Sequence, residues 1–152
     1  MLTPLVYSPA IEKKYEIGLV LRWSDTEWLG KSVGPGVKLI DLGTSDVEGV
    51  LDQMLSCKYI ITSSLHGLII ADAYGIPNAW LSSKSPAGFE FKFYDYFLSV
   101  DKVRHATEFD IAVNDITVEV LEENFTFDGR KINFDSYALL DACPFLKRKQ
   151  PS

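Results

Sequence analysis

The sequence predicts an α/β fold, a Rossmann-like parallel sheet with helices on both faces. Short apolar, β-branched runs alternate with segments of helical periodicity along the first half of the chain. The connections between them are short, which favours right-handed strand–helix–strand crossovers and therefore a parallel sheet. A chain of 152 residues fits one ordinary domain, so we expect residues 1–152 to form a single Rossmann-like domain.

The first two strands are expected at residues 17–21 and 37–41, where apolar runs lie on either side of a Gly-Pro-Gly turn. Apolar side chains then recur at intervals of three and four between residues 47 and 55, which predicts an amphipathic helix. Ser45 is the expected N-cap of this helix, with Glu48 three residues later as in a capping box.

The centre of the chain predicts a buried strand that runs directly into a buried helix. Residues 59–62 are aromatic and β-branched, which is typical of a central strand. Ser63 and Ser64 follow and are expected to supply capping hydroxyls for a helix over residues 66–74. Gly75 and Pro77 end that helix, and residues 78–81 form a fourth strand.

The second half of the chain is less regular. Aromatic residues crowd positions 89–97 and are compatible with stacking on a sugar, but the helical spacing of Phe93, Tyr96 and Phe97 favours core packing. Residues 116–121 fit a strand by their alternation and a helix by their acidic continuation, and both remain open. Residues 132–143 predict a terminal helix with Phe134, Tyr137 and Ala138 on its apolar stripe.

Composition excludes several classes of function. There are 15 Lys and Arg against 21 Asp and Glu, a net charge of −6, so we expect no nucleic-acid partner. No apolar run approaches the roughly 18 residues of a membrane span, and the N-terminus does not resemble a signal peptide. We therefore expect a cytoplasmic protein, in solution or peripheral at the inner membrane face. Cys57 and Cys143 have no ligand-spaced neighbours, so no metal is expected.

Residues that follow the predicted strands define a candidate anion site, because ligands of open parallel sheets bind beyond the carboxyl ends of the strands. His66 sits at a helix start, where backbone amides favour phosphate or carboxylate, although a lone histidine at such a position is more often structural than catalytic. Gly67 allows close approach of a ligand or a neighbouring strand. Arg22 and Lys84 follow other strands, and each also fits a solvated loop. Lys92 adds a further cation, unless its stem simply packs over aromatic rings.

Several of these segments together resemble the polysaccharide pyruvyl transferase family, in particular its exopolysaccharide ketal-pyruvate branch. The resemblance is carried by residues 15–20, 55–60, 63–77, 91–97 with Ser99, and 142–145, with the serine, histidine and glycine turn at its centre. Members of this family are about twice as long and fold as two Rossmann-like halves in the manner of GT-B glycosyltransferases. The chain resembles the C-terminal half, so the resemblance implies a missing N-terminal half or a homodimer.

The resemblance implies transfer of pyruvate from phosphoenolpyruvate to a sugar as a ketal, in bacterial exopolysaccharide biosynthesis. Phosphoenolpyruvate would be the donor substrate, with no separate cofactor, and the acceptor would be a saccharide, free or lipid-linked. His66 would be catalytic, as acid or base, and Ser63, Ser64, Gly67, Arg22, Lys84 and Lys92 would bind substrate. Many members have arginine where this chain has Ser64, whereas the exopolysaccharide branch often has serine there. As a fragment, the chain is expected to be inactive.

Two other functions remain open from the sequence. The first is the nucleotide-sugar-binding half of a GT-B glycosyltransferase, which would place an acidic residue such as Asp72 on a ribose. Asp72 lies about 120 degrees around the helix from His66, which weakens this alternative. The second is a non-catalytic, truncated remnant that keeps the fold and an interface.

Overall fold

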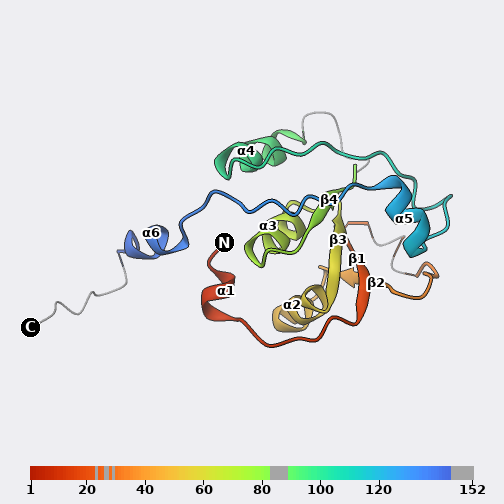
Figure 1. Cartoon of the computed structure of the whole chain (residues 1–152), viewed down its shortest axis with the longest axis horizontal. Helices are drawn as coiled ribbons and strands as arrows, with labels where there is room; N and C mark the ends of the chain where they lie inside the picture. The colour runs from red at the N-terminus through yellow and green to blue at the C-terminus, as the bar shows by residue number, and fades with distance from the viewer. Residues whose placement is uncertain (23, 26–27, 29, 83–88, 145–152) are drawn as a thin grey trace, which may run out of the picture.

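A computed structural model describes residues 1–22, 24–25, 28, 30–82 and 89–144 (Figure 1). Its centre is a parallel sheet of four strands in the order β2-β1-β3-β4. The strands are β1 (Tyr15–Leu21), β2 (Val37–Asp41), β3 (Cys57–Thr62) and β4 (Asn78–Trp80). The predicted Rossmann-like parallel sheet is therefore confirmed.

The strand register aligns the carboxyl ends of all four strands at one edge of the sheet. Val20 of β1 lies opposite Ile40 of β2 and Thr62 of β3, and Ile61 of β3 lies opposite Ala79 of β4. Polar residues follow at this edge after each strand, as expected for a doubly wound sheet. Arg22 and Ser63 follow β1 and β3 at this edge, and α3 begins there.

Helices α2 (Val47–Leu55) and α3 (Leu65–Ala73) cover one face of the sheet. Their apolar side chains share a buried cluster with strand residues of that face, comprising Val20, Ile40, Val50, Met54, Cys57, Ile60, Ala71 and Ile76. The predicted cap of α2 is wrong by one residue. The carboxylate of Asp46, not the hydroxyl of Ser45, accepts from the Gly49 amide at 2.9 Å, and its charge also suits the positive end of the helix.

Helix α5 (Val118–Asn124) covers the opposite face, so both faces carry helices. Its side chains and the segment before it pack on the outward-facing residues of β1 and β3, in a cluster that includes Ile17, Leu19, Leu21, Ile61, Ile111, Ile116, Leu121 and Phe125. The open choice at residues 116–121 is settled as a helix. Thr117 caps it through its side chain, which accepts from the Val120 amide at 3.3 Å, and Ile116 is buried just before it.

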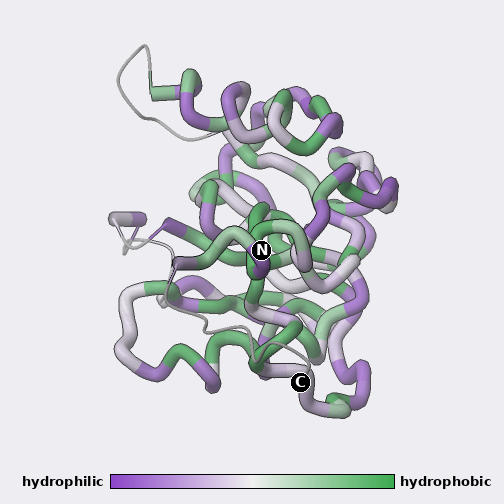
Figure 2. Tube along the Cα trace, turned by 90° about the vertical axis from the view of Figure 1, so that its left-hand side faces the viewer, coloured by the Kyte–Doolittle hydropathy of each residue, from purple (hydrophilic) through white to green (hydrophobic). Residues whose placement is uncertain are grey.

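Helix α4 (Phe91–Ser99) lies beside α3 at the end of the sheet formed by β4. Phe93, Tyr96 and Phe97 are buried against Trp80, whose ring stacks on Phe93 with centroids 4.5 Å apart. Core packing of these aromatic residues is therefore confirmed. The coils of α4, at the top of Figure 2, alternate between hydrophobic and hydrophilic segments, as a helix with one buried side requires.

The ends of the chain carry two short helices, α1 (Thr3–Val6) and α6 (Ser136–Asp141). The terminal helix predicted over residues 132–143 is too long, because Asp135 caps it by accepting from the amides of Tyr137 and Ala138. No residue of α6 is buried, and Tyr137 is 68% exposed. The predicted apolar stripe is thus not a core-facing stripe.

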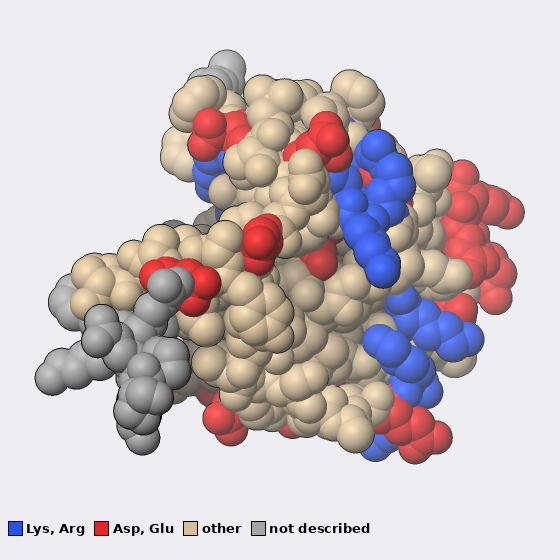
Figure 3. Space-filling model, turned by 60° about the vertical axis from the view of Figure 1, so that its left-hand side comes forward, with Lys and Arg blue, Asp and Glu red and all other residues tan. Residues whose placement is uncertain are grey.

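The surface mixes both signs of charge. Figure 3 shows Lys and Arg side chains in a band along one side of this face, with Asp and Glu side chains beyond them and uncharged residues over most of the remainder. Of the helices in the described part of the chain, none combines the length and the apolar character that crossing a bilayer requires.

A buried ion cluster joins the last turn of α3 to the segment after α4. The Asp72 carboxylate accepts from Lys102 at 2.8 Å, from Arg104 at 2.5 Å and from the Tyr96 hydroxyl at 2.8 Å. The Asn78 amide donates to the same carboxylate at 2.8 Å. Burial alone would raise the pKa of Asp72, but the bonds and charges of Arg104, then Lys102 and Asn78, hold it below its ordinary value.

Replacing Asp72 with Asn should destabilise the fold by about 3 to 5 kcal/mol near neutral pH, because two buried cations lose their counter-charge. The pKa of Asp72 is lower in the folded chain than in the unfolded chain. The stability contributed by its ionised form is therefore complete above pH about 4 and is lost as the pH falls through the folded pKa.

Urea unfolding followed by tryptophan fluorescence, from about pH 7 to about pH 3, measures the free energy of unfolding. The difference in this free energy between wild type and Asp72→Asn should decrease only below pH about 4. Asp95→Asn, on the exposed side of α4, is the matched control and should change stability little. A difference in the free energy of unfolding that stays constant down to pH about 3 would contradict a stabilising role of ionised Asp72.

Candidate functional site

The candidate site begins where β3 turns into α3. Ser64 is the N-cap of α3 with an extended backbone, and its hydroxyl makes no capping bond. Thr62 intervenes instead, since its Oγ1 accepts from the Ser64 amide at 3.0 Å. The Ser63 hydroxyl donates to Asp25 at 2.8 Å. The expectation that the serine hydroxyls cap this helix is therefore wrong for Ser64, and that of Ser63 is engaged elsewhere.

His66 is the second residue of α3, and its side chain is exposed. The first amide of this helix to bond within it is that of Leu68, which donates to the Ser64 carbonyl at 3.2 Å. The amides of Leu65, His66 and Gly67 precede it and have no acceptor within the helix. Together with the helix dipole, these amides give the start of α3 the character of an anion site.

Gly67 brings α3 into close contact with the end of β3. A Cβ built on Gly67 would collide with Oγ1 of Thr62 and would come within 3.0 Å of its Cβ. Of the two expected reasons for this glycine, the structure shows the approach of a neighbouring strand. The contact fixes the position of His66 relative to the sheet, because His66 directly precedes Gly67 in the helix.

A second network links the carboxyl ends of β1 and β3. The amide of Arg22 donates to Ser63 Oγ at 3.2 Å and to Asp25 Oδ2 at 3.3 Å. The Arg22 guanidinium lies 3.6 Å from Asp25, so part of its charge is balanced. Arg22 and Ser63, which the sequence placed after separate strands, are thus brought together by the sheet.

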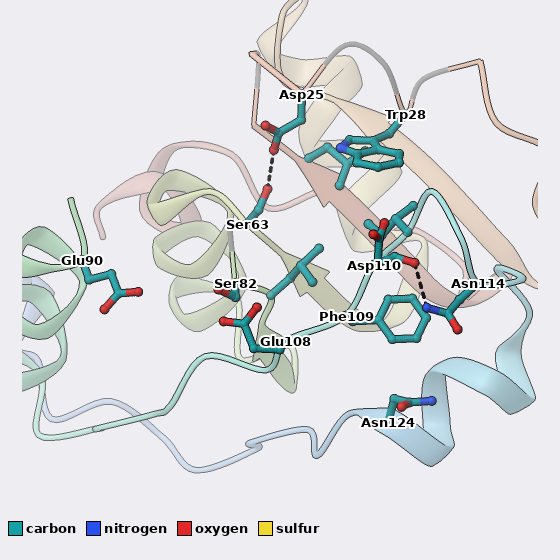
Figure 4. Close-up of a pocket in the computed structure, with 13 residues that line it drawn as sticks. Asp25, Trp28, Ser63, Ser82, Glu90, Glu108, Phe109, Asp110, Asn114 and Asn124 are labelled. Atoms are coloured by element: carbon teal, nitrogen blue, oxygen red, sulfur yellow. Dashed lines mark hydrogen bonds between the residues drawn. The ribbon is translucent and has the colours of Figure 1, made fainter. Parts of the chain in front are cut away.

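Beside this network, a cavity of about 610 Å³ opens at the carboxyl ends of β1, β3 and β4 (Figure 4). Its volume falls in the usual range of small-molecule sites. The described residues that line it are Leu21, Asp25, Trp28, Ser63, Leu81, Ser82, Glu90, Glu108, Phe109, Asp110, Ile111, Asn114 and Asn124.

The described lining of this cavity is acidic. Asp25, Glu90, Glu108 and Asp110 contribute carboxylates, and no Lys or Arg is among the described lining residues. This differs from the cationic cleft that the sequence led us to expect. The described residues include no group of three or more His, Cys, Asp or Glu that could hold a metal ion.

One wall of the cavity is a loop held by a lysine from another part of the chain. The Lys31 ammonium donates to the carbonyls of Ile111, of Ala112 at 2.6 Å and of Asn114 at 3.4 Å. The Asn114 amide also donates to the carbonyl of Asp110 at 2.8 Å. These bonds order the segment that carries Asp110 and Asn114 into the cavity wall.

The remaining predicted residues are not among the described residues that line the cavity. His66, Ser64 and Gly67 form the start of α3 next to Ser63. The Lys92 ammonium lies over the rings of Phe89 and Phe93, 5.1 and 5.5 Å from their centroids, as the packing alternative for this lysine describes. Lys84 lies outside the described residues.

Sequence reasoning missed most of the cavity wall, including Trp28 as a lining residue, Glu108, Phe109 and Asp110. A local signal was Asp110 itself, a residue type that favours Asx turns, and its carboxylate accepts from the Ala112 amide at 2.9 Å. Cys57 is not a nucleophile of the site, because burial raises the pKa of its thiol to about 11.

Asp72 does not reach the cavity or the start of α3. Its carboxylate is fully engaged with Lys102, Arg104, Asn78 and Tyr96 in the protein interior. A ribose would have to displace these buried partners to bind it. The acidic residue that a nucleotide-sugar site would use near the end of this helix is therefore not available.

Comparisons with known proteins give one family and one relative. A family model described as polysaccharide pyruvyl transferase matches residues 5–85, which include all four strands and α3. The "Uncharacterized protein L143" of Acanthamoeba polyphaga mimivirus is 38% identical over an alignment of 98 residues, and the match covers 56% of this chain and 32% of that protein. The chain thus spans about a third of the length of this relative. No solved structure matches.

Gly67→Ala should destabilise the domain by about 1 to 3 kcal/mol, since the added methyl group overlaps the side chain of Thr62, whose backbone is fixed in β3. Adding Thr62→Ala in the same chain should recover part of the loss. Gly30→Ala is the matched control, because an added Cβ there has no atom within 4 Å. Equal losses for the two glycine variants in urea unfolding would show that the contact with Thr62 is not what requires glycine.

Proposed function

The chain belongs to the polysaccharide pyruvyl transferase family, and we propose that it is a domain that binds phosphoenolpyruvate for transfer of pyruvate to a saccharide as a ketal. The observation that carries this proposal is the start of α3. There, an exposed histidine and three amides without helical acceptors lie at the carboxyl end of the central strand. This arrangement suits an anion that must also exchange a proton.

The donor would lie with its phosphate or carboxylate on the amides of Leu65, His66 and Gly67. These amides present fixed partial positive charge and need no rearrangement to bind. The backbone and side chain of Arg22 lie next to Ser63, one residue before the N-cap, and would add positive charge from β1. Lys84 and Lys92 remain candidates for further contacts with the donor.

The proposed reaction needs proton transfer and no redox step. A proton is added to the methylene carbon of phosphoenolpyruvate, and a sugar hydroxyl attacks the adjacent carbon and releases its own proton. Phosphate then leaves with the electrons of its C–O bond, and the second hydroxyl closes the ketal ring with loss of another proton. Imidazole exchanges protons near neutral pH, so His66 serves either to protonate the carbon or to accept a hydroxyl proton.

Turnover would also need a cover over the open site. The anion-binding amides and the cavity both face the same edge of the sheet, and the chain spans only 32% of its viral relative. We propose that a second domain or a second copy of the chain closes this edge, excludes water and aligns the acceptor. The nucleotide-sugar alternative is disfavoured by the engagement of Asp72, and a non-catalytic remnant would retain the fold without donor binding.

Phosphoenolpyruvate added to the isotope-labelled chain should shift the backbone amide signals of Leu65, His66 and Gly67. His66→Ala should weaken this binding by about tenfold, the effect of losing one hydrogen bond to a charged group. His105→Ala is the matched control, because the chain has 2 histidines and His105 is also exposed. Shifts confined to other regions, or equal effects of the two variants, would contradict donor binding at α3.

The purified chain, incubated with phosphoenolpyruvate and pyruvylatable oligosaccharides, should not produce ketal over multiple turnovers. Proximity and orientation contribute about 7 to 11 kcal/mol of barrier lowering, and an uncovered site lacks them. Phosphate release and product mass measure the result, with a reaction lacking the chain as control. Sustained ketal formation would mean that two copies of the chain build the complete site.

A further inference from the structure

We propose that the cavity beyond β1, β3 and β4 is a subsite for an uncharged saccharide of one or two rings, and that it excludes the phosphorylated donor. The inference rests on the proposed function in one respect, which is that the saccharide is the acceptor. Its structural basis is separate, because it concerns the cavity and not the start of α3. The volume of about 610 Å³ accommodates a ligand of this size.

The carboxylates of the cavity are suited to accept hydrogen bonds from sugar hydroxyls. Among the described residues, Glu90 and Glu108 have no hydrogen-bond or ion-pair partner for their carboxylates, so their acceptor oxygens are available. Figure 4 shows Glu108 close to Ser82, and Glu90, the N-cap of α4, projecting toward the same space. The Asn124 side chain on α5 adds an amide that both donates and accepts.

Two aromatic side chains give the cavity an apolar surface for the faces of a sugar ring. Trp28 and Phe109 both line the cavity and pack with their other sides on the core cluster below the sheet. Phe109 is further held by Phe125, with ring centroids 5.4 Å apart. Rings fixed in this way bury the C–H faces of a saccharide at little cost in side-chain entropy.

The cavity wall is formed before any ligand binds. Lys31 donates to three carbonyls of the loop over residues 111–114, which holds Asp110 and Asn114 in place. Because Lys31 binds carbonyls and is not among the described lining residues, its charge is used to order the wall rather than to attract an anion. Preorganisation of this kind lowers the entropic cost of binding.

The charge of each site favours one of the two ligands, the phosphorylated donor or the uncharged saccharide. A phosphorylated donor would meet the carboxylates of Glu90, Glu108 and Asp110 in the cavity, and like charges in a partly enclosed space repel. The start of α3 has the opposite character, with amide donors and His66. Ser63 belongs to the cavity lining, and α3 begins two residues later, so a sugar hydroxyl and the donor would meet at this junction.

The two proposed ligand sites also differ in how far the family match covers them. Residues 5–85 contain the strands and the start of α3, whereas Glu90, the 108–114 segment and Asn124 lie outside that range. The proposed donor-binding turn thus belongs to the part of the chain that matches the family. Of the acidic and aromatic lining residues, Asp25 and Trp28 lie within the match, whereas Glu90, Glu108, Phe109 and Asp110 lie outside it, where a specificity for one saccharide would be encoded.

The test is a nuclear magnetic resonance titration of the labelled chain with the methyl glycosides of glucose, galactose, mannose and N-acetylglucosamine, and separately with phosphoenolpyruvate. At least one glycoside should shift the signals of Glu108, Asp110, Asn114 and Asn124, while phosphoenolpyruvate should leave them in place. Glu108→Gln should weaken glycoside binding about threefold to tenfold, since a bond to a charged acceptor becomes a neutral one.

Glu122→Gln is the matched control, because Glu122 lies on α5, is exposed and does not line the cavity. Lys31→Met should weaken glycoside binding without touching the sugar, and its spectrum reports whether the rest of the fold is intact. If Lys31→Met unfolds the chain, the comparison of Glu108→Gln with Glu122→Gln still decides the proposal.

Absence of glycoside shifts at the cavity, equal effects of Glu108→Gln and Glu122→Gln, or phosphoenolpyruvate binding in the cavity would each overturn the inference. Failure of the proposed function gives a different result, namely no phosphoenolpyruvate shifts at Leu65, His66 and Gly67. The two failures are therefore observed with different ligands at different residues.

Discussion

The contact between Gly67 and Thr62 is the constraint on which the candidate site depends. It lets α3 start close to the end of β3, with only Ser63 and Ser64 between the central strand and the helix. Thr62 also accepts from the Ser64 amide and so fixes the turn itself. The helix start, the exposed His66 and the cavity residue Ser63 all take their positions from this junction, and any larger residue in place of Gly67 would displace them together.

Most of the sheet could be predicted from the sequence, because each strand is a short apolar run with β-branched residues and each crossover is short. The helix caps were harder, since Ser45 and Asp46 are both good caps and only the structure shows which side chain meets the Gly49 amide. The predicted terminal helix was too long and too buried, because periodicity in residues 132–143 does not reveal whether another surface packs against the helix. Burial of α6 depends on tertiary packing, which no local pattern encodes.

The candidate site also has a part that could be predicted from the sequence and a part that could not. The start of α3 was predictable because its residues are adjacent in the chain, and Arg22 was placed at the same edge by the order of the strands. The cavity was not predictable, because Trp28, Phe109 and Asn124 come from three distant segments that meet only in the folded chain. Together with the carboxylates of the lining they make the cavity aromatic and acidic, whereas Arg22, Lys84 and Lys92 had suggested a cationic site.

The buried cluster at Asp72 has a mechanical consequence for α3. One end of the helix carries the proposed anion site, and the other end is fixed to β4 through Asn78 and to the segment after α4 through Lys102 and Arg104. The C-terminal end of α3 is therefore held by the ion cluster, and its N-terminal end is held against the sheet by the contact between Gly67 and Thr62. A ligand at the N-terminal end of α3 therefore binds a rigid surface. Any movement that encloses the ligand has to come from the parts of the protein around α3 and not from α3 itself.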